Sequence, residues 1–152
     1  AEQTALELKY LIDKGRHQKA VRLYHHLRGE IALNKGNAPE AIEELEKAIS
    51  MAVHQSDALF ISSLARAYII AGQSKKAMEA YTRLLNLRDG IKGYGDLNTL
   101  GHYRMGLILE ELGQDEEARR NMEKFLSLWK DADAGLPEVE DAKKRMAGLT
   151  SH

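Results

Sequence analysis

The sequence predicts an all-α protein of about eight helices. Apolar residues recur every three or four positions along most of the 152 residues, as they do on one face of a helix. Strand-like alternation is absent at any useful length, and only two prolines occur. Glycine-containing segments separate the helical stretches, which indicates short turns between helices.

Composition limits the classes of function. Hydrophobic residues make up 43% and charged residues 30%, with a net charge of -1 at pH 7, which is typical of a soluble globular protein. This balance gives no electrostatic reason to expect a nucleic-acid or membrane partner. No apolar run approaches the roughly 20 residues that span a bilayer, and we expect no signal peptide. We therefore expect a soluble protein, cytoplasmic rather than exported.

Four segments share the pattern Gly-x-x-x-x-Ala, and each predicts a turn between two helices. Glycine can end a helix in the left-handed conformation at no steric cost, and the small alanine lets the next helix approach its neighbour. In the second segment, Asn37 and Glu40 have the spacing of a capping box, and Pro39 suits a first helical turn. The segments are Gly15–Ala20, Gly36–Ala41, Gly72–Ala77 and Gly113–Ala118.

The helices around the last three turns also match one another. A small residue lies twelve positions before each alanine, and a large one lies four positions after it. This pattern resembles the tetratricopeptide repeat, a helix–turn–helix unit of about 34 residues, which implies a right-handed α-solenoid. The family's usual fourth-position tryptophan is replaced by His25, Ile61 and His102. The small residues are Gly29, Ala65 and Gly106, and the large ones are Leu45, Tyr81 and Met122.

We expect one domain over residues 1–152. Ala20 and Ala41 are too close for a hairpin, so residues 16–35 are predicted to form one long helix. The leading helix before it is the remnant of an earlier repeat or an end cap. Val139, Ala142, Met146 and Leu149 give the last helix an apolar stripe that suits a cap. The predicted parts are a leading helix (1–15), repeat 1 (22–55), repeat 2 (58–88), an inserted loop (89–98), repeat 3 (99–130) and a capping helix (136–149).

The chain begins without methionine, so we expect it to be part of a longer protein. The run from Phe125 through the last helix resembles the end of repeat arrays attached to larger bacterial proteins, including signalling kinases and regulators.

Residues that could carry chemistry do not form a recognisable site. The adjacent His25 and His26 point about 100° apart on a helix, so they cannot easily share a metal ion. The chain has no cysteine, and its carboxylates mostly alternate with Lys or Arg, as on a solvated surface. Ser62 and Ser63 lack the glycine and histidine context of a nucleophile. We expect no metal, no cofactor and no enzymatic activity.

The resemblance implies that the first helix of each repeat lines a concave groove. We expect this groove to bind an extended or helical peptide with acidic and apolar side chains, with Arg66, Tyr103 and Arg104 as anchors. Alternatively, Arg66 pairs with Glu30 across neighbouring helices. The candidate groove residues are His26, Glu30, Arg66, Ile69, Tyr103 and Arg104.

One subfamily uses this groove to grip the C-terminal carboxylate of chaperone tails with Lys, Asn and Arg side chains. Here His26 and Glu30 occupy the places of its first Lys and Asn. Ser63 replaces its second Asn and Leu100 its second Lys, so only Arg104 agrees. The sequence therefore does not predict a carboxylate clamp.

The leading hypothesis is a non-catalytic protein–protein interaction module with a protein or peptide partner. A self-association module, in which exposed repeat ends stack into a homo-oligomer, is one alternative. A ligand-sensing regulatory domain, with the loop at Gly90–Gly95 closing over a small molecule, is another.

Overall fold

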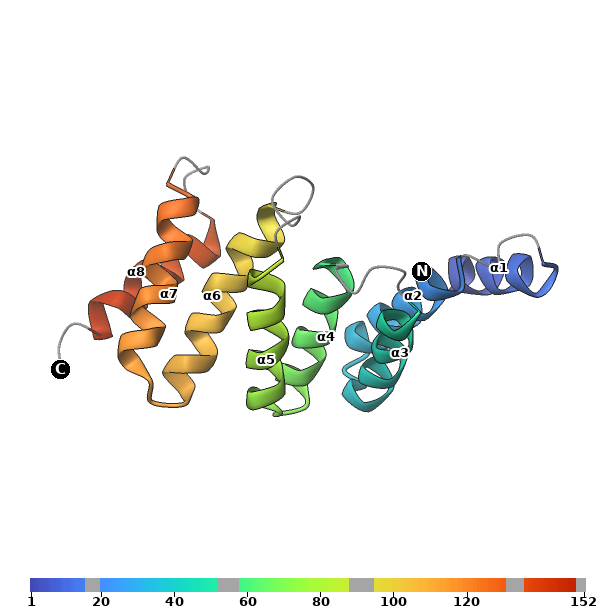
Figure 1. The fold of residues 1–152 in the computed structure, drawn as a ribbon, viewed down its shortest axis with the longest axis horizontal. Coiled ribbons are helices and arrows are strands. Elements are labelled where there is room, and N and C mark those ends of the chain that lie inside the picture. Colours follow the sequence, from blue (N-terminus) through green and yellow to red (C-terminus); the bar gives the residue numbers. More distant parts are fainter. Residues whose placement is uncertain (16–19, 52–57, 88–94, 131–135, 150–152) are drawn as a thin grey trace. The chain divides into compact units, whose positions relative to one another are not determined.

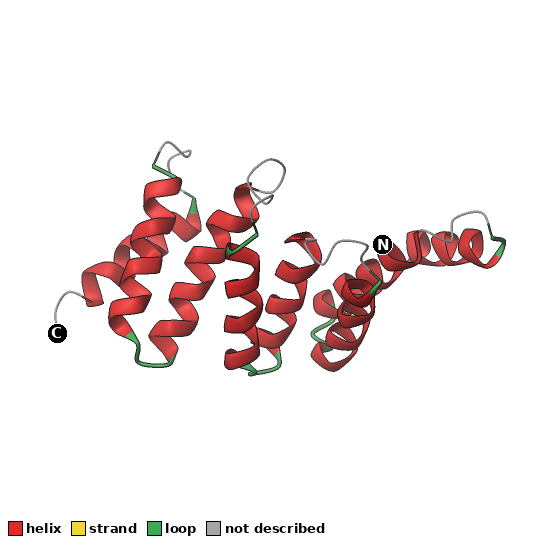
Figure 2. Cartoon of the chain, viewed as in Figure 1, coloured by secondary structure: helices red, strands yellow, loops and turns green. Residues whose placement is uncertain are grey.

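The computed structural model describes residues 1–15, 20–51, 58–87, 95–130 and 136–149. Every regular element in these residues is a helix, and α1 to α8 follow one another along the chain (Figures 1 and 2). The chain divides into an N-terminal unit, Ala1–Leu87, and a C-terminal unit, Arg88–His152. The helices are α1 (Glu2–Asp13), α2 (Val21–Asn34), α3 (Ala38–Ser50), α4 (Ala58–Ile70), α5 (Ser74–Leu85), α6 (Gly95–Glu111), α7 (Asp115–Leu128) and α8 (Pro137–Leu149).

The glycines of all four predicted turns adopt the left-handed conformation, and residues 16–19 of the first segment lie outside the described residues. Gly15, Gly36, Gly72 and Gly113 have φ angles of 70°, 72°, 68° and 70°, the left-handed region that glycine adopts without strain. After α2, the N–H of Gly36 donates to the carbonyl of Leu33 at 3.0 Å, and the N–H of the next residue donates to Ala32 at 2.9 Å. The same pair of bonds follows α4 and α6. These are Schellman motifs, which satisfy carbonyls at the helix end and reverse the chain.

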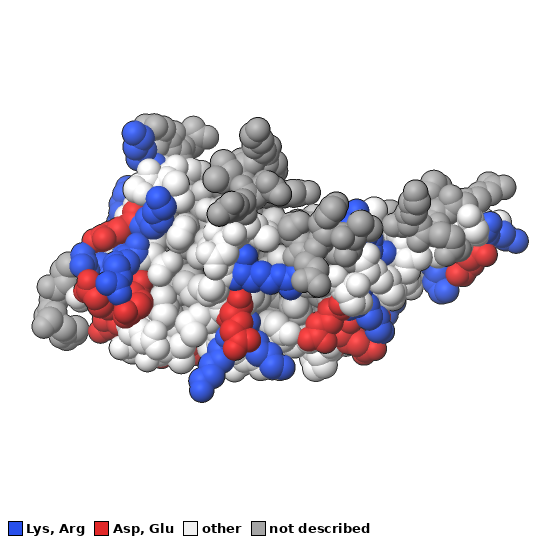
Figure 3. Space-filling view, viewed as in Figure 1, with Lys and Arg blue, Asp and Glu red and all other residues white. Residues whose placement is uncertain are grey.

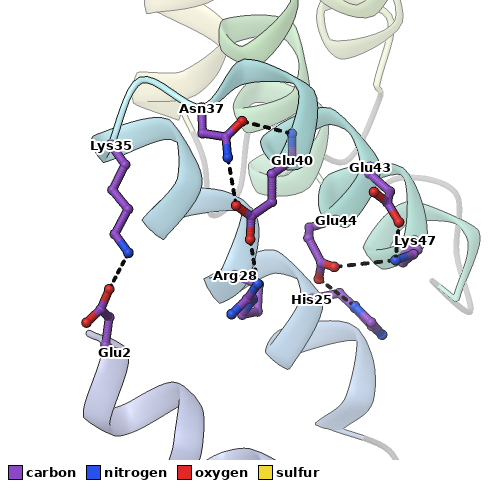
Figure 4. Close-up of polar contacts among 9 residues, drawn as sticks. All are labelled: Glu2, His25, Arg28, Lys35, Asn37, Glu40, Glu43, Glu44 and Lys47. Carbon is purple, nitrogen blue, oxygen red and sulfur yellow. Dashed lines mark hydrogen bonds and ion pairs between the residues drawn. The ribbon is translucent and has the colours of Figure 1, made fainter.

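The predicted cap of α3 is also present. The Oδ1 atom of Asn37 accepts from the N–H of Glu40 at 3.4 Å, and its Nδ2 donates to the Glu40 carboxylate at 2.9 Å (Figure 4). Pro39 lies in the first turn, where its missing N–H leaves no bond unmade. This cap fixes the point at which α3 turns back along α2.

Within each hairpin, the small residue of the first helix packs against the large residue of the second. A Cβ atom on Gly29 would lie 2.5 Å from Cγ of Leu45, and one on Gly106 would lie 2.8 Å from Cε of Met122. Ala65 and Tyr81, the equivalent residues of α4 and α5, are both fully buried. The helices therefore approach so closely that only the smallest side chains fit at this position.

The ends of the two units are closed by single helices. Ala5 and Ile12 are the buried residues of α1. In the C-terminal unit, α8 packs on α7 through Ala142, which joins a buried cluster with Met122 and Phe125. Val139, Met146 and Trp129 also pack against this cluster. The predicted apolar stripe of the last helix thus faces the unit's core.

One predicted boundary needs correction and another is tested only in part. The described part of the predicted helix 16–35 contains α2, Val21–Asn34, and residues 16–19 lie outside the described residues. The predicted loop 89–98 is too long, since α6 begins at Gly95 and Asp96 lies in its first turn. An acidic side chain favours a helix N-terminus, which explains this early start. The rest of that loop, including Gly90, lies outside the described residues.

Candidate functional site

One face of the N-terminal unit is built by parallel rows of side chains on α2 and α4. On α4, Leu59, Ser63, Arg66 and Ile70 are three or four residues apart and so share one side of the helix. On α2, the corresponding row is Leu23, His26, Glu30 and Asn34. We call this surface the α2–α4 face. It contains three of the predicted groove residues, His26, Glu30 and Arg66, and we include in it the fourth, Ile69, which is exposed beside Ile70.

His26 links the two helices at the centre of the α2–α4 face. Its Nε2 lies 3.1 Å from the Ser63 hydroxyl oxygen, and its ring stacks on Phe60 with 4.4 Å between centroids. The Ser63 hydroxyl donates to the Leu59 carbonyl at 3.1 Å. Because that hydroxyl has one proton, its oxygen accepts from His26, which places the imidazole proton on Nε2.

Glu30 and Arg66 form the second link, in agreement with the alternative interpretation of the sequence. Nη1 of Arg66 lies 3.4 Å from both carboxylate oxygens of Glu30. The two side chains are 37% and 26% exposed, so the ion pair is solvated and weak. The contact engages one nitrogen of the guanidinium, which carries five donors in all.

Apolar side chains lie at both ends of the α2–α4 face. Leu23 and Leu59 are exposed near the start of their helices, and Ile69 and Ile70 are exposed at the end of α4. Leu59 and Ile70 are eleven residues apart, which corresponds to about 16 Å along a helix. The face therefore combines two apolar ends with a polar centre.

The other two predicted groove residues, Tyr103 and Arg104, lie on α6 in the C-terminal unit. The Tyr103 hydroxyl donates to Asp141 of α8 at 2.8 Å, and its ring packs on Phe125. Burial, together with this bond to Asp141, raises the pKa of Tyr103 to about 12. Arg104 is half-buried, and within the described residues its guanidinium has no hydrogen-bond or ion-pair partner.

Sequence reasoning missed the polar contacts by which α8 holds α6. Arg145 donates to Asp141 at 2.6 Å and to Glu110 of α6 at 2.9 Å. The hydrogen bond from Arg145, followed by that from Tyr103, lowers the pKa of Asp141. A signal for this arrangement was present, since Ala142 follows Gly106 at the same spacing of 36 residues that separates Gly29 from Ala65. The helix α8 thus corresponds to the first helix of a further repeat.

The fourth-position histidines hold their own hairpins together. Nδ1 of His25 lies 2.8 Å from the Glu44 carboxylate (Figure 4), and Nδ1 of His102 lies 3.1 Å from Oδ1 of Asn121. Both contacts join residues nineteen positions apart, one on each helix of a repeat. No group of three or more His, Asp or Glu side chains suited to a metal ion occurs in the part of the chain that the structure describes. None of the described helices is long and apolar enough to cross a bilayer.

Sequence profiles of the tetratricopeptide repeat match three segments, residues 23–52, 61–90 and 102–132, which together cover more than half of the chain. The chain therefore belongs to the tetratricopeptide repeat family. No curated protein sequence matches it.

Solved structures agree with this assignment. The first tetratricopeptide-repeat domain of the human RPAP3 protein is similar with a TM-score of 0.66 and 19% identity, over 86% of this chain and 91% of that one. The second such domain, solved with the HSP70 peptide SGPTIEEVD, has a TM-score of 0.66 and 22% identity, over 90% and 98%. A Podosopora anserina protein with nearly identical TPR-like repeats gives 0.69 and 20%, over 88% and 66%. These likenesses establish the all-α repeat-solenoid fold.

Membership of this family supports a protein–protein interaction module. Proteins of the family and fold are typically non-catalytic.

Proposed function

We propose that the α2–α4 face of the N-terminal unit binds a peptide that carries acidic and apolar side chains. The observation that carries this proposal is the arrangement of exposed apolar residues at both ends of the face around a partly engaged guanidinium. Arg66 can donate to a peptide carboxylate through nitrogens that Glu30 does not contact. Ile69 and Ile70 at one end, and Leu23 and Leu59 at the other, supply apolar contacts.

The contacts at the centre of the face argue against a grip on a C-terminal carboxylate. Glu30 places a negative charge where a clamp would present an amide, and it would repel a second carboxylate. His26 and Ser63, at two further clamp positions, are bonded to each other. The expected partner therefore presents an internal segment with a single acidic side chain opposite Arg66. A net charge of -1 also favours a protein partner over nucleic acid or a membrane surface.

Selection from a random peptide library displayed on phage, followed by fluorescence anisotropy of the selected peptides, tests the proposal. We expect Arg66→Ala and Ile70→Ser each to weaken binding at least about tenfold, since the first removes the central cation of the face and the second removes an apolar contact at its end. Lys75→Ala, an exposed cation on α5, is the matched control and leaves the affinity unchanged.

Arg104→Ala tests the part of the groove prediction that falls on α6. A peptide that uses Arg104 as an anchor loses affinity in this variant, and one confined to the α2–α4 face does not. Selected peptides whose affinity is unaffected by Arg66→Ala, Ile70→Ser and Arg104→Ala would contradict the groove assignment.

A further inference from the structure

The helix α1 carries the two most exposed large apolar side chains of the described residues. Leu6 is 64% exposed and Tyr10 is 61% exposed. They are four residues apart, so they share one face of the helix, while Ala5 and Ile12 are buried on the opposite side. An apolar face of this kind, directed away from the unit that carries it, indicates an interaction surface.

A hollow opens beside Leu6, between α1, α2 and α3. It has a volume of about 190 Å³, and Ala5, Ile31 and Ala32 form its apolar lining. A cavity of about 150 Å³ accommodates benzene, so this hollow has room for an aromatic ring.

The rim of the hollow is polar. Glu2 pairs with Lys35 at 2.5 Å, and Arg28 pairs with Glu40 (Figure 4). These four side chains line the hollow and offer both donors and acceptors to a phenol hydroxyl. A tyrosine side chain therefore matches the hollow in size, in the apolar character of its lining and in the polarity of its rim.

We propose that α1 is a self-association surface. In a two-fold dimer of this chain, Tyr10 of each copy enters the hollow beside Leu6 of the other. This inference goes beyond peptide binding and does not depend on it. Tyr10 lies one helical turn after Leu6, beside which the hollow opens. In an antiparallel pair of α1 helices centred at Leu8, Tyr10 of each copy is level with Leu6 of the other, so both hollows are filled at once. A different protein could fill the hollow, but only a second copy of this chain also buries the exposed Tyr10 in a matching hollow.

An interface built on a helix of 12 residues is small, so the dimer is weak and its population depends on concentration.

Sedimentation equilibrium of the full chain over about a hundredfold range of concentration tests the proposal. We expect a reversible monomer–dimer equilibrium whose dissociation constant rises at least tenfold in Tyr10→Ala, since two tyrosines are lost per dimer. Leu128→Ala, which shortens an exposed apolar side chain on α7, is the control and leaves the constant within about twofold. Circular dichroism should show the same helix content in both variants. A monomer at every concentration, or a Leu128→Ala effect as large as that of Tyr10→Ala, would overturn the assignment.

Disulfide cross-linking tests the orientation of the two helices, because the chain has no cysteine of its own. In the antiparallel pair, Glu7 of the two copies is offset by about 3 Å along the helix axis and Gln3 by about 15 Å. Glu7→Cys should therefore form a disulfide-linked dimer under mild oxidation, and Gln3→Cys on the same face should not. Equal cross-linking of the two variants would indicate a parallel pair and overturn the proposed arrangement.

Discussion

Gly29 and Gly106 occupy equivalent places in α2 and α6, but the side chains that face them differ in flexibility. Gly29 faces the branched Cγ of Leu45, which is fully buried. Gly106 faces the terminal methyl of Met122, which can move aside by rotation about three bonds. A glycine at this position therefore matters more for stability in the α2–α3 hairpin than in the α6–α7 hairpin.

We expect Gly29→Ala to lower the free energy of unfolding by up to about 2 kcal/mol, because overpacking costs about 1–3 kcal/mol and the gain in helix propensity returns about 1 kcal/mol. Gly106→Ala should change it by less than about 1 kcal/mol, since Met122 can adjust. Urea unfolding of the two variants measures the difference. Equal effects would mean that Leu45 moves as readily as Met122.

A second prediction at this scale concerns the terminal carboxylate of a bound peptide. A peptide selected against this chain and its C-terminal amide should bind with affinities within about twofold of each other, because Glu30 opposes a carboxylate at the centre of the α2–α4 face. Fluorescence anisotropy with both labelled peptides measures the ratio. A tenfold preference for the free acid would show that a clamp forms despite Glu30.

At the scale of elements, α8 is held to α6 by polar contacts as well as by the apolar cluster. Asp141 accepts from Tyr103 and Arg145, and Arg145 also reaches Glu110. Trp129 is the only tryptophan of the chain and packs beside this cluster, so its fluorescence reports the docking of α8. We expect Asp141→Ala to shift the Trp129 emission to longer wavelength at a lower urea concentration than in the unmodified chain. Glu140→Ala, an exposed acid of the same helix, is the control.

The docking of α8 should also depend on pH. The pKa of Asp141 lies below its ordinary value of 3.8 in the folded chain, so its contribution to stability is present above that value and is lost as the pH falls through the lower folded pKa. The pKa of Tyr103 is raised from 10.0 to about 12, so its contribution is present below pH 10 and is lost as the pH rises toward 12. Urea midpoints from Trp129 emission should fall at both extremes. Tyr103→Phe should remove the alkaline decline and reduce the acid decline, because the bond from Tyr103 also contributes to the lowered pKa of Asp141.

Helix ends were predictable where one residue type determines the backbone. The four turn glycines and the Asn37 cap act through local geometry, so the helix ends that they determine can be predicted from the sequence. The start of α6 was not predicted, because glycine at position 95 suggests a loop, whereas the following acid and the packing of the helix favour an earlier start.

The contacts of the candidate site were predictable only where they follow from the spacing of the repeats. Glu30 and Arg66 hold the same position in successive repeats, so their pairing follows from the repeat pattern. The bond from Tyr103 to Asp141 depends on how α8 lies along α6, and the turn pattern does not extend to that helix. The contact of His26 with Ser63 was not predictable either, since it depends on the distance between α2 and α4.

Over the whole molecule, acidic and basic side chains are interspersed rather than segregated. Figure 3 shows Lys and Arg beside Asp and Glu on the face in view. Many are exposed pairs within one helix, such as Lys47 with Glu43 and Arg119 with Glu116. Such pairs contribute little and are screened by salt. We therefore expect the melting temperature to change by only a few degrees between about 0.05 and 1 M NaCl. A larger fall would show that charge pairs stabilise the fold more than its apolar contacts.

The correspondence between α8 and a first helix has a practical consequence for protein engineering. Since Ala142 holds the place that Ala65 holds in α4, a helix with the sequence of α5 could be joined after α8 through a glycine turn like that at Gly72. The added helix would pack on the side of α8 that faces away from α7, so the array could be lengthened by one unit while the cluster of Ala142, Met122 and Phe125 stays as it is.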